Sequence, residues 1–217
     1  MVAELKVQEI YPTPLWLMDL DEKTRTRLNR DLLKKIHALT EPKPVLPVGG
    51  SWQTDPMLQE LSEFEELLGL IRKAAKGALD FLQVEYDDFE ITSCWANINP
   101  TGGKNSSHTH PNNYLSGVYY VAVPKGTGSI DFKDPRVQAS AIMPPVKERN
   151  AFNGNNVTVP VMEGRLILFP AWLNHEVPVN RGDKERVSIS FNIMFTRFTE
   201  TISPTLWRKG SAPVRMD

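Results

Sequence analysis

Residues 185–193 alternate strictly between polar and apolar side chains. The polar positions are Arg186, Ser188, Ser190 and Asn192, and the apolar positions are Val187, Ile189, Phe191 and Ile193. Successive side chains of a β-strand point to opposite faces, so this run predicts a strand with one polar and one apolar face. The polar face either meets solvent, or it lines the mouth of a barrel while N-terminal helices cover the apolar face.

Similar β-type runs fill the chain from residue 89 to residue 198. Short stretches rich in Ile, Val, Tyr and Phe alternate there with Gly, Pro and Asn turns. We expect strands near residues 89–99, 106–110, 115–123, 128–133, 155–160, 164–169, 175–179 and 185–197. This number of strands is typical of a double-sheet jelly roll. The longest interval without a strand, residues 134–154, is expected to be a lid, a binding loop or a disordered segment.

Two amphipathic helices are expected before the β region. Residues 21–39 repeat apolar side chains at helical spacing, and a second helix is expected to run to about residue 84. Asp55-Pro56 resembles a helix start, and Ser62 with Glu65 resembles a second capping box. Residues 5–20 are expected to be extended.

The expected fold class is therefore mainly β with N-terminal helices: a double-stranded β-helix, or jelly roll, covered on one face by helices. We expect a single domain over residues 1–217, because all-β domains often reach this length. Within it we expect an N-terminal helical support (1–86), a jelly-roll core (87–198) and a C-terminal tail (199–217).

Composition and charge limit the expected partners and location. The formal net charge is −1 and the basic residues are scattered, so we expect no nucleic-acid or membrane partner. Cys94 is the single cysteine, so the chain cannot form an internal disulfide. We expect Cys94 to be a small buried residue. No stretch approaches the roughly 18 apolar residues that span a bilayer, so we expect a soluble, cytoplasmic protein. Exposed strand edges would allow a homodimer.

Three of the four histidines fall in the β region and define a candidate metal site. His108 and His110 occupy positions i and i+2, which lie on one face of a strand about 7 Å apart at Cα, so both imidazoles can reach one ion. His175 follows far downstream. Three imidazoles suit Fe, Zn, Cu or Ni and fit Mg or Ca poorly. His37 is expected to be a partly exposed residue of the first helix.

Arg186 follows these histidines at the start of the alternating strand. Its planar guanidinium matches a carboxylate, and Ser188 on the same face can add a hydroxyl to the same oxygen. The pair predicts a carboxylate-binding site beside the metal.

Together these motifs resemble the Fe(II)/2-oxoglutarate-dependent oxygenases. The resemblance covers roughly residues 89–197 and is nearest to the prolyl-hydroxylase-like branch. A still closer resemblance is to small 2-oxoglutarate-Fe(II) oxygenases of marine bacteria and phages. The motifs are His108-Thr109-His110-Pro111, Leu115-Ser116-Gly117-Val118-Tyr119-Tyr120, Phe169-Pro170-Ala171-Trp172-Leu173-Asn174-His175, His175-Glu176-Val177-Pro178 and Arg186-Val187-Ser188.

The resemblance implies a role for each candidate residue. The catalytic, metal-binding residues are His108, His175 and, in the third ligand position, His110. Those implied to bind the cosubstrate 2-oxoglutarate are Arg186, Ser188, Tyr120 and, as a weaker candidate, Asn97. Asn97 equally fits a polar residue at a strand end.

The implied activity is that of a dioxygenase using Fe(II), O2 and 2-oxoglutarate. Such an enzyme hydroxylates a peptide or small-molecule substrate and forms succinate and CO2. Candidates for the substrate side are Asp134-Pro135-Arg136, Trp172 and the loop 134–154.

One position departs from the family pattern. His110 stands where these oxygenases carry a carboxylate, so the site is one charge unit more positive, which disfavours Fe(III) and higher states. A shifted register, with His110 as first ligand and Asn112 as second, would spoil the spacing to the Tyr119-Tyr120 strand.

Two other hypotheses stay open. A cupin-like module would hold Zn or Ni through the three histidines without oxygenase activity. A structural or interaction β-sandwich would carry them incidentally.

Overall fold

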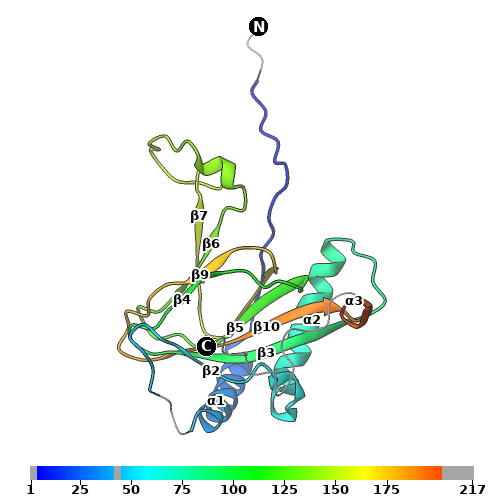
Figure 1. Ribbon diagram of the computed structural model, residues 1–217, viewed down its shortest axis with the longest axis vertical. Coiled ribbons are helices and arrows are strands. Elements are labelled where there is room, and N and C mark those ends of the chain that lie inside the picture. Colours follow the sequence, from blue (N-terminus) through cyan, green and yellow to red (C-terminus); the bar gives the residue numbers. More distant parts are fainter. Residues whose placement is uncertain (1–3, 42–44, 202–217) are drawn as a thin grey trace, which may run out of the picture.

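The alternating run forms strand β10 in the middle of a six-stranded sheet, here called the major sheet (Figure 1). The computed structural model describes residues 4–41 and 45–201, with side chains up to residue 198. The order in the major sheet is β1 (Trp16–Asp19), β8 (Arg165–Pro170), β5 (Leu115–Ala122), β10 (Arg186–Phe195), β3 (Phe89–Asn99) and β2 (Trp52–Gln53). Every neighbouring pair is antiparallel.

A four-stranded minor sheet completes the jelly roll. Its order is β4 (Asn105–His108), β9 (His175–Val177), β6 (Ser129–Lys133) and β7 (Asn156–Pro160). These pairs are antiparallel as well. A small apolar cluster with members such as Tyr120, Phe132 and Phe169 joins the two sheets. The eight expected core strands are confirmed, with ends that move by at most two residues.

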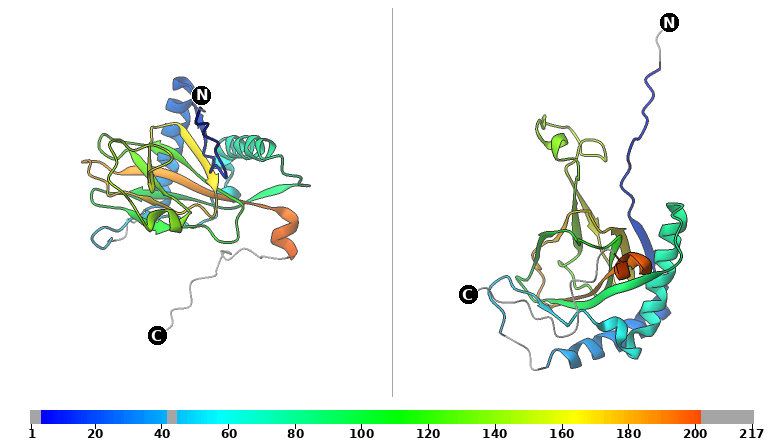
Figure 2. Two further views of the ribbon diagram at one scale, coloured as in Figure 1. Left: turned by 90° about the horizontal axis from the view of Figure 1, so that it is seen from above. Right: turned by 45° about the vertical axis from the view of Figure 1, so that its right-hand side comes forward.

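Two long helices lie along the major sheet, on the face away from the minor sheet (Figures 1 and 2). They are α1 (Glu22–Leu39), which the Asp21 side chain caps by accepting from the Thr24 amide, and α2 (Glu65–Phe81). Their buried residues share one core cluster with the apolar row of β10. The helices therefore cover the apolar face of β10, as the barrel interpretation requires.

The predicted start of α2 is wrong. Two 3-10 turns, η1 (Leu58–Glu60) and η2 (Ser62–Phe64), precede it, and the residue before α2 offers no side-chain cap. The turns bury Leu58 and Phe64 in the core, and this packing outweighs the local capping preference of Ser62, whose hydroxyl turns to Glu63. Two short helices remain, η3 (Val137–Ser140) and α3 (Thr196–Thr201).

The polar row of β10 faces the space between the sheets. Arg186, Ser188 and Asn192 are all buried, so the alternative in which this row meets solvent is wrong. Cys94 is buried as expected, and burial raises the pKa of its thiol. His37 is partly exposed as expected and pairs with Glu185 at 2.6 Å.

Some sequence predictions lie outside what the structure tests. No helix within residues 4–41 and 45–201 has the length and apolarity to cross a membrane. The division into support, core and tail stays a prediction, as does the cytoplasmic location. Most of the expected tail, from residue 202 on, lies outside the described residues.

We predict opposite effects for the same substitution at two glycines. A Cβ on Gly117 would meet the Phe191 ring at 2.3 Å and the Ile167 carbonyl at 2.7 Å, so Gly117→Ala should lower the free energy of unfolding by about 1–3 kcal/mol. Gly69 lies exposed in α2 with nothing within 4 Å, so Gly69→Ala should raise it by roughly 0.5–1 kcal/mol. Urea unfolding measures both, and equal effects would contradict the close strand packing at Gly117.

Candidate active site

Three histidines converge at one end of the jelly roll. His108 ends β4 and lies directly opposite His175, which begins β9. His110 lies two residues further on, where its backbone amide donates to the Ala171 carbonyl at 2.9 Å. Ligand nitrogens of the three rings all lie within 4.8 Å of one another. The two strand ends and the His110–Ala171 hydrogen bond thus gather residues far apart in the sequence, as the His-x-His pattern with a distant His predicts.

Backbone hydrogen bonds fix the orientation of two of the rings. Nδ1 of His108 lies 2.7 Å from the Ser106 carbonyl, and Nδ1 of His175 lies 2.9 Å from the Leu173 carbonyl. A carbonyl only accepts, so both Nδ1 atoms carry the proton and both Nε2 atoms keep a free lone pair. This tautomer is typical of metal-binding histidines.

Burial keeps the inner histidines neutral. The pKa of His110 is lowered to about 3, mainly by desolvation and in smaller part by the neighbouring His175 and His108. Desolvation also lowers the pKa of His175 to about 4, with His108 adding to the effect while the hydrogen bond to the Leu173 carbonyl opposes it. The neutral imidazole is the form that binds metals.

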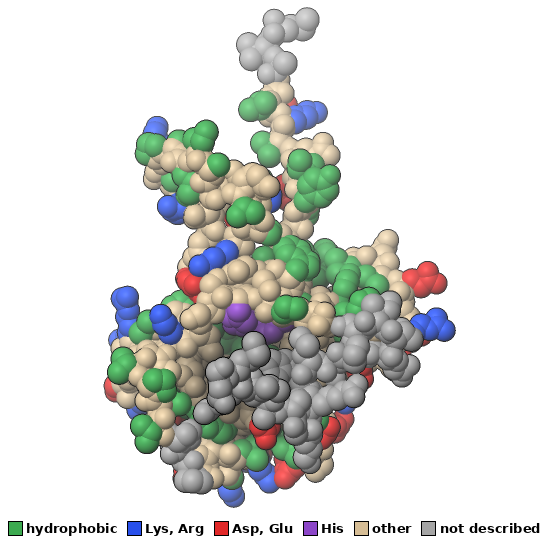
Figure 3. All heavy atoms as spheres, in the orientation of Figure 1, with side chains coloured by type: hydrophobic (Ala, Val, Ile, Leu, Met, Phe, Trp, Pro, Cys, Tyr) green, Lys and Arg blue, Asp and Glu red, His purple; other side chains and the backbone are tan. Residues whose placement is uncertain are grey.

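Aromatic rings surround these histidines. The Trp95 ring lies 5.9 Å from that of His110, and Phe169 and Phe132 lie 4.7 Å and 5.9 Å from His175. His108 is the most exposed of the three, and His175 is buried. Histidine side chains are visible at the molecular surface in Figure 3, so the cluster opens outward on one side.

Arg186 is a buried cation further inside the barrel. It is 2% exposed, and its guanidinium donates to the carbonyls of Thr127 (3.1 Å) and Ser129 (3.4 Å) and to Oδ1 of Asn99 (3.1 Å). All three acceptors are neutral. Within the described residues its guanidinium hydrogen-bonds to no carboxylate, and its Nε has no hydrogen-bond partner. Burial lowers the pKa of Arg186, and only the nearby Tyr120 opposes the shift.

The other predicted cosubstrate residues lie on the same interior face. Ser188 is opposite Asn97 on β3 and opposite Tyr120 on β5. The Tyr120 hydroxyl is buried without a hydrogen-bond partner, whereas Tyr119 points to the helices and donates to Oδ1 of Asn29 on α1. The structure therefore brings together all four predicted residues.

The asparagines of β3 have different surroundings. Asn97 is occupied on both sides, since it accepts from Gln53 (2.7 Å) and donates to Ser190 (3.0 Å). Asn99 instead accepts from Arg186, and the sequence interpretation missed it. The alternation of side chains along β3 could have indicated Asn99. Ser93, Trp95, Asn97 and Asn99 lie on the interior face of β3, opposite the polar row of β10.

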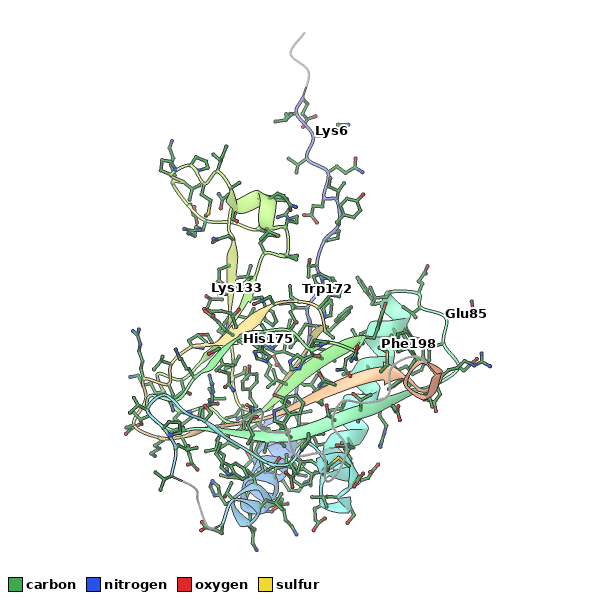
Figure 4. The ribbon with its side chains drawn as sticks, viewed as in Figure 1. Lys6, Glu85, Lys133, Trp172, His175 and Phe198 are labelled. Atoms are coloured by element: carbon green, nitrogen blue, oxygen red, sulfur yellow. The ribbon has the colours of Figure 1, made fainter. Side chains whose placement is uncertain are left out.

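The candidate substrate-side residues lie toward one end of the molecule. Trp172 lies between β8 and β9 and is 55% exposed, and Asp134 forms an ion pair with Arg136 at 2.8 Å. Trp172 and Lys133 lie on the same side of His175 in Figure 4. The loop 134–154 projects away from the sheets (Figure 1). A substrate role for these residues stays a prediction.

The fold and the site together define a jelly roll with three imidazoles that could hold a metal ion and a buried arginine in its interior. Residues 93–192 match the family model described as "Putative 2OG-Fe(II) oxygenase". Over these residues the chain is similar to the 2OG-Fe(II) oxygenases. No curated protein matches the sequence.

Solved structures with this fold are similar over most of the chain. They include the non-heme alpha-ketoglutarate-dependent epimerase SnoN from nogalamycin biosynthesis (13% identity, 84% of this chain and 79% of that chain, TM-score 0.59). A Pseudomonas putida prolyl-4-hydroxylase is 16% identical (83% and 92%, TM-score 0.54). HygX from Streptomyces hygroscopicus, solved with nickel and 2-oxoglutarate bound, is 12% identical (85% and 83%, TM-score 0.58). At these identities the likeness shows the jelly-roll fold.

We predict that metal binding separates His108 from His37. His108→Ala removes one of three clustered imidazoles, so affinity for Co(II) or Ni(II) should fall by at least about 100-fold, whereas His37→Ala on α1 should leave it unchanged. Anaerobic calorimetry measures both. Unchanged affinity in His108→Ala would contradict a metal site at this cluster.

Proposed function

We propose that this protein is an Fe(II)- and 2-oxoglutarate-dependent dioxygenase that hydroxylates a peptide or small-molecule substrate and forms succinate and CO2. His108, His110 and His175 hold the metal, and Arg186, Ser188 and Tyr120, with Asn97 beside them, bind the cosubstrate. The observation that carries this proposal is the buried guanidinium of Arg186, which has only neutral partners near a cluster of metal-binding side chains.

A buried charge without a counter-ion is costly, typically by several kcal/mol. Arg186 stays protonated even where burial lowers its pKa, because the guanidinium is an extremely weak acid. The interior therefore carries a positive charge that an anionic ligand would balance. A carboxylate is the natural partner of the planar guanidinium.

Unused hydrogen-bond donors support a carboxylate at this place. The Tyr120 hydroxyl and Arg186 Nε are both buried and both lack a partner, and native proteins leave few such atoms unpaired. A carboxylate has two oxygens and about four acceptor positions, so one bound carboxylate can satisfy both donors. Ser188 lies beside Tyr120 in the register and offers a further hydroxyl.

The spacing between the two parts of the site suits a short dicarboxylate. Trp95, whose ring lies next to His110, is opposite Ser190, four residues along β10 from Arg186. Four residues correspond to roughly 13 Å along a strand. The long Arg186 side chain and a five-carbon 2-oxo diacid together fit this interval, with the 2-oxo acid end toward the histidines.

Each set of residues has a defined task. The Nε2 atoms of His108 and His175, together with His110, would hold the metal. Iron with 2-oxoglutarate and O2 would supply the oxidising chemistry. Phe132 and Phe169 keep water from the buried side of His175, and the exposed side next to His108 admits the substrate.

A cupin-like protein that holds Zn or Ni without oxygenase activity is the second candidate. Its support is the ligand set itself, because His110 supplies a neutral imidazole where these oxygenases carry a carboxylate. A cupin-like function does not explain why Arg186 is buried without a counter-ion or why the Tyr120 hydroxyl is unpaired. Metal analysis discriminates: tight Zn with no affinity for 2-oxoglutarate would favour it over the oxygenase.

The direct test is anaerobic addition of Fe(II) and then 2-oxoglutarate. The proposal expects the visible charge-transfer band of a chelated 2-oxo acid, and after admission of air it expects succinate. Absence of both the band and succinate would overturn it.

We predict that Tyr120 and Tyr119 respond differently to loss of the hydroxyl. Tyr120→Phe removes an unpaired buried hydroxyl, so it should not lower the free energy of unfolding, but it should weaken 2-oxoglutarate binding about 5–20-fold. Tyr119→Phe leaves Asn29 Oδ1 without its donor, so it should cost about 1–3 kcal/mol of stability and leave 2-oxoglutarate affinity unchanged. Urea unfolding and anaerobic calorimetry measure the two effects, and the reverse pattern would contradict the assignment of Tyr120.

A further inference from the structure

The hairpin of β6 and β7 with its connection, residues 129–160, projects from the minor sheet away from the body of the molecule (Figures 1 and 2). We call it the arm. Its exposed apolar side chains are Val137, Ile142, Met143, Val146, Phe152 and Val157. A two-stranded hairpin alone is at best marginally stable in water, and exposed apolar side chains gathered on one element mark an interaction site. Among the residues that the structure describes, none covers these apolar side chains of the arm.

A second unpartnered element leaves the body on the same side (Figures 1 and 2). Residues 4–14, here called the N-terminal segment, form no helix or strand and bend at Tyr11 (φ 56°), and within the described residues they make no backbone–backbone hydrogen bond. Leu5 and Val7 alternate with the polar Glu4, Lys6 and Gln8, which is the pattern of a strand with one apolar face. Leu5 is 92% exposed. Residues 4–8 thus have the sequence pattern of a strand, and they pair with none of the strands that the structure describes.

The arm offers an open sheet edge. The order of the minor sheet ends at β7, which pairs with β6 on one side only. Nearly all β7 side chains are exposed, including Val157. An uncovered edge strand presents unpaired N–H and C=O groups, which an extended segment can bind by adding a strand.

We propose that two copies of the chain form a homodimer in which the N-terminal segment of each copy adds to the free edge of β7 of the other. Each chain supplies one extended segment and one open edge, so a single two-fold axis satisfies both pairs at once. Residues 4–14 reach about 36 Å when extended, roughly twice the length of a five-residue strand such as β7. The segment of the same chain runs beside the arm without hydrogen-bonding to it (Figure 1).

Charge favours this pairing. Residues 4–14 carry Glu4 and Glu9 against Lys6, a net charge of −1. The connection of the arm, residues 134–155, carries three basic side chains (Arg136, Lys147 and Arg149) against two acidic ones (Asp134 and Glu148), a net charge of +1. The two surfaces therefore attract, whereas two arms facing each other would repel.

The arm is also continuous with the candidate active site. Phe132 of β6 lies opposite His175 of β9, and the Lys133 amide donates to the Asn174 carbonyl at 2.9 Å. Lys133 also pairs with Glu176 at 3.0 Å. A partner strand on β7 would extend the minor sheet from the strand of His175 outward. The dimer itself does not depend on the proposed oxygenase activity.

Light scattering coupled to size exclusion tests the proposal with surface variants of the full chain. The unmodified chain should have the mass of two chains, and both Leu5→Lys/Val7→Lys and Val157→Lys should have the mass of one. Val48→Lys, at a fully exposed apolar position far from the arm in sequence, is the matched control and should stay dimeric. These side chains are exposed, so the fold should survive, and circular dichroism checks it.

Hydrogen exchange then distinguishes strand addition from other dimers. Amides of residues 4–8, and those of residues 156–159 that do not bond to β6, should exchange slowly in the unmodified chain and at least about tenfold faster in Leu5→Lys/Val7→Lys. A single-chain mass for the unmodified protein overturns the proposal. A dimer that persists in Leu5→Lys/Val7→Lys or in Val157→Lys also overturns it. So does a dimer in which these amides are not protected.

Discussion

The charge of Arg186 is the constraint on which the interior of this barrel depends. Burying a guanidinium is tolerable only where its donors are satisfied, and Thr127, Ser129 and Asn99 provide neutral oxygens for part of it. These neutral oxygens do not balance the positive charge, which a bound anion would balance. The unbalanced charge of Arg186 and the unpaired Tyr120 hydroxyl are therefore the features of the fold that support binding of a carboxylate cosubstrate.

Alternation along strands made much of this architecture predictable. The polar and apolar rows of β10 required two different environments, and the helical periodicity upstream supplied a cover for the apolar row, so the jelly roll followed from the sequence. The start of α2 did not follow, because burial of Leu58 and Phe64 overrode the local capping signal of Ser62. Tertiary packing decides such boundaries, and a local pattern does not contain it.

The candidate site was predictable in its residues and less so in its partners. The positions of His108, His110 and His175 come from strand spacing, but the carbonyls that fix two of the rings belong to the backbone and leave no mark in the sequence. The partner of Arg186 on β3 was missed for a related reason. Asn97 and Asn99 share one face, and only the register between β3 and β10 selects Asn99.

We propose that Arg186 binds the distal carboxylate of a 2-oxo diacid. Calorimetry of the anaerobic Fe(II) protein should compare 2-oxoglutarate with 2-oxopentanoate, which keeps the metal-chelating end and lacks the second carboxylate. 2-Oxopentanoate should bind roughly 100-fold more weakly, since it leaves the buried charge of Arg186 unpaired. Equal affinity for the two acids would contradict it.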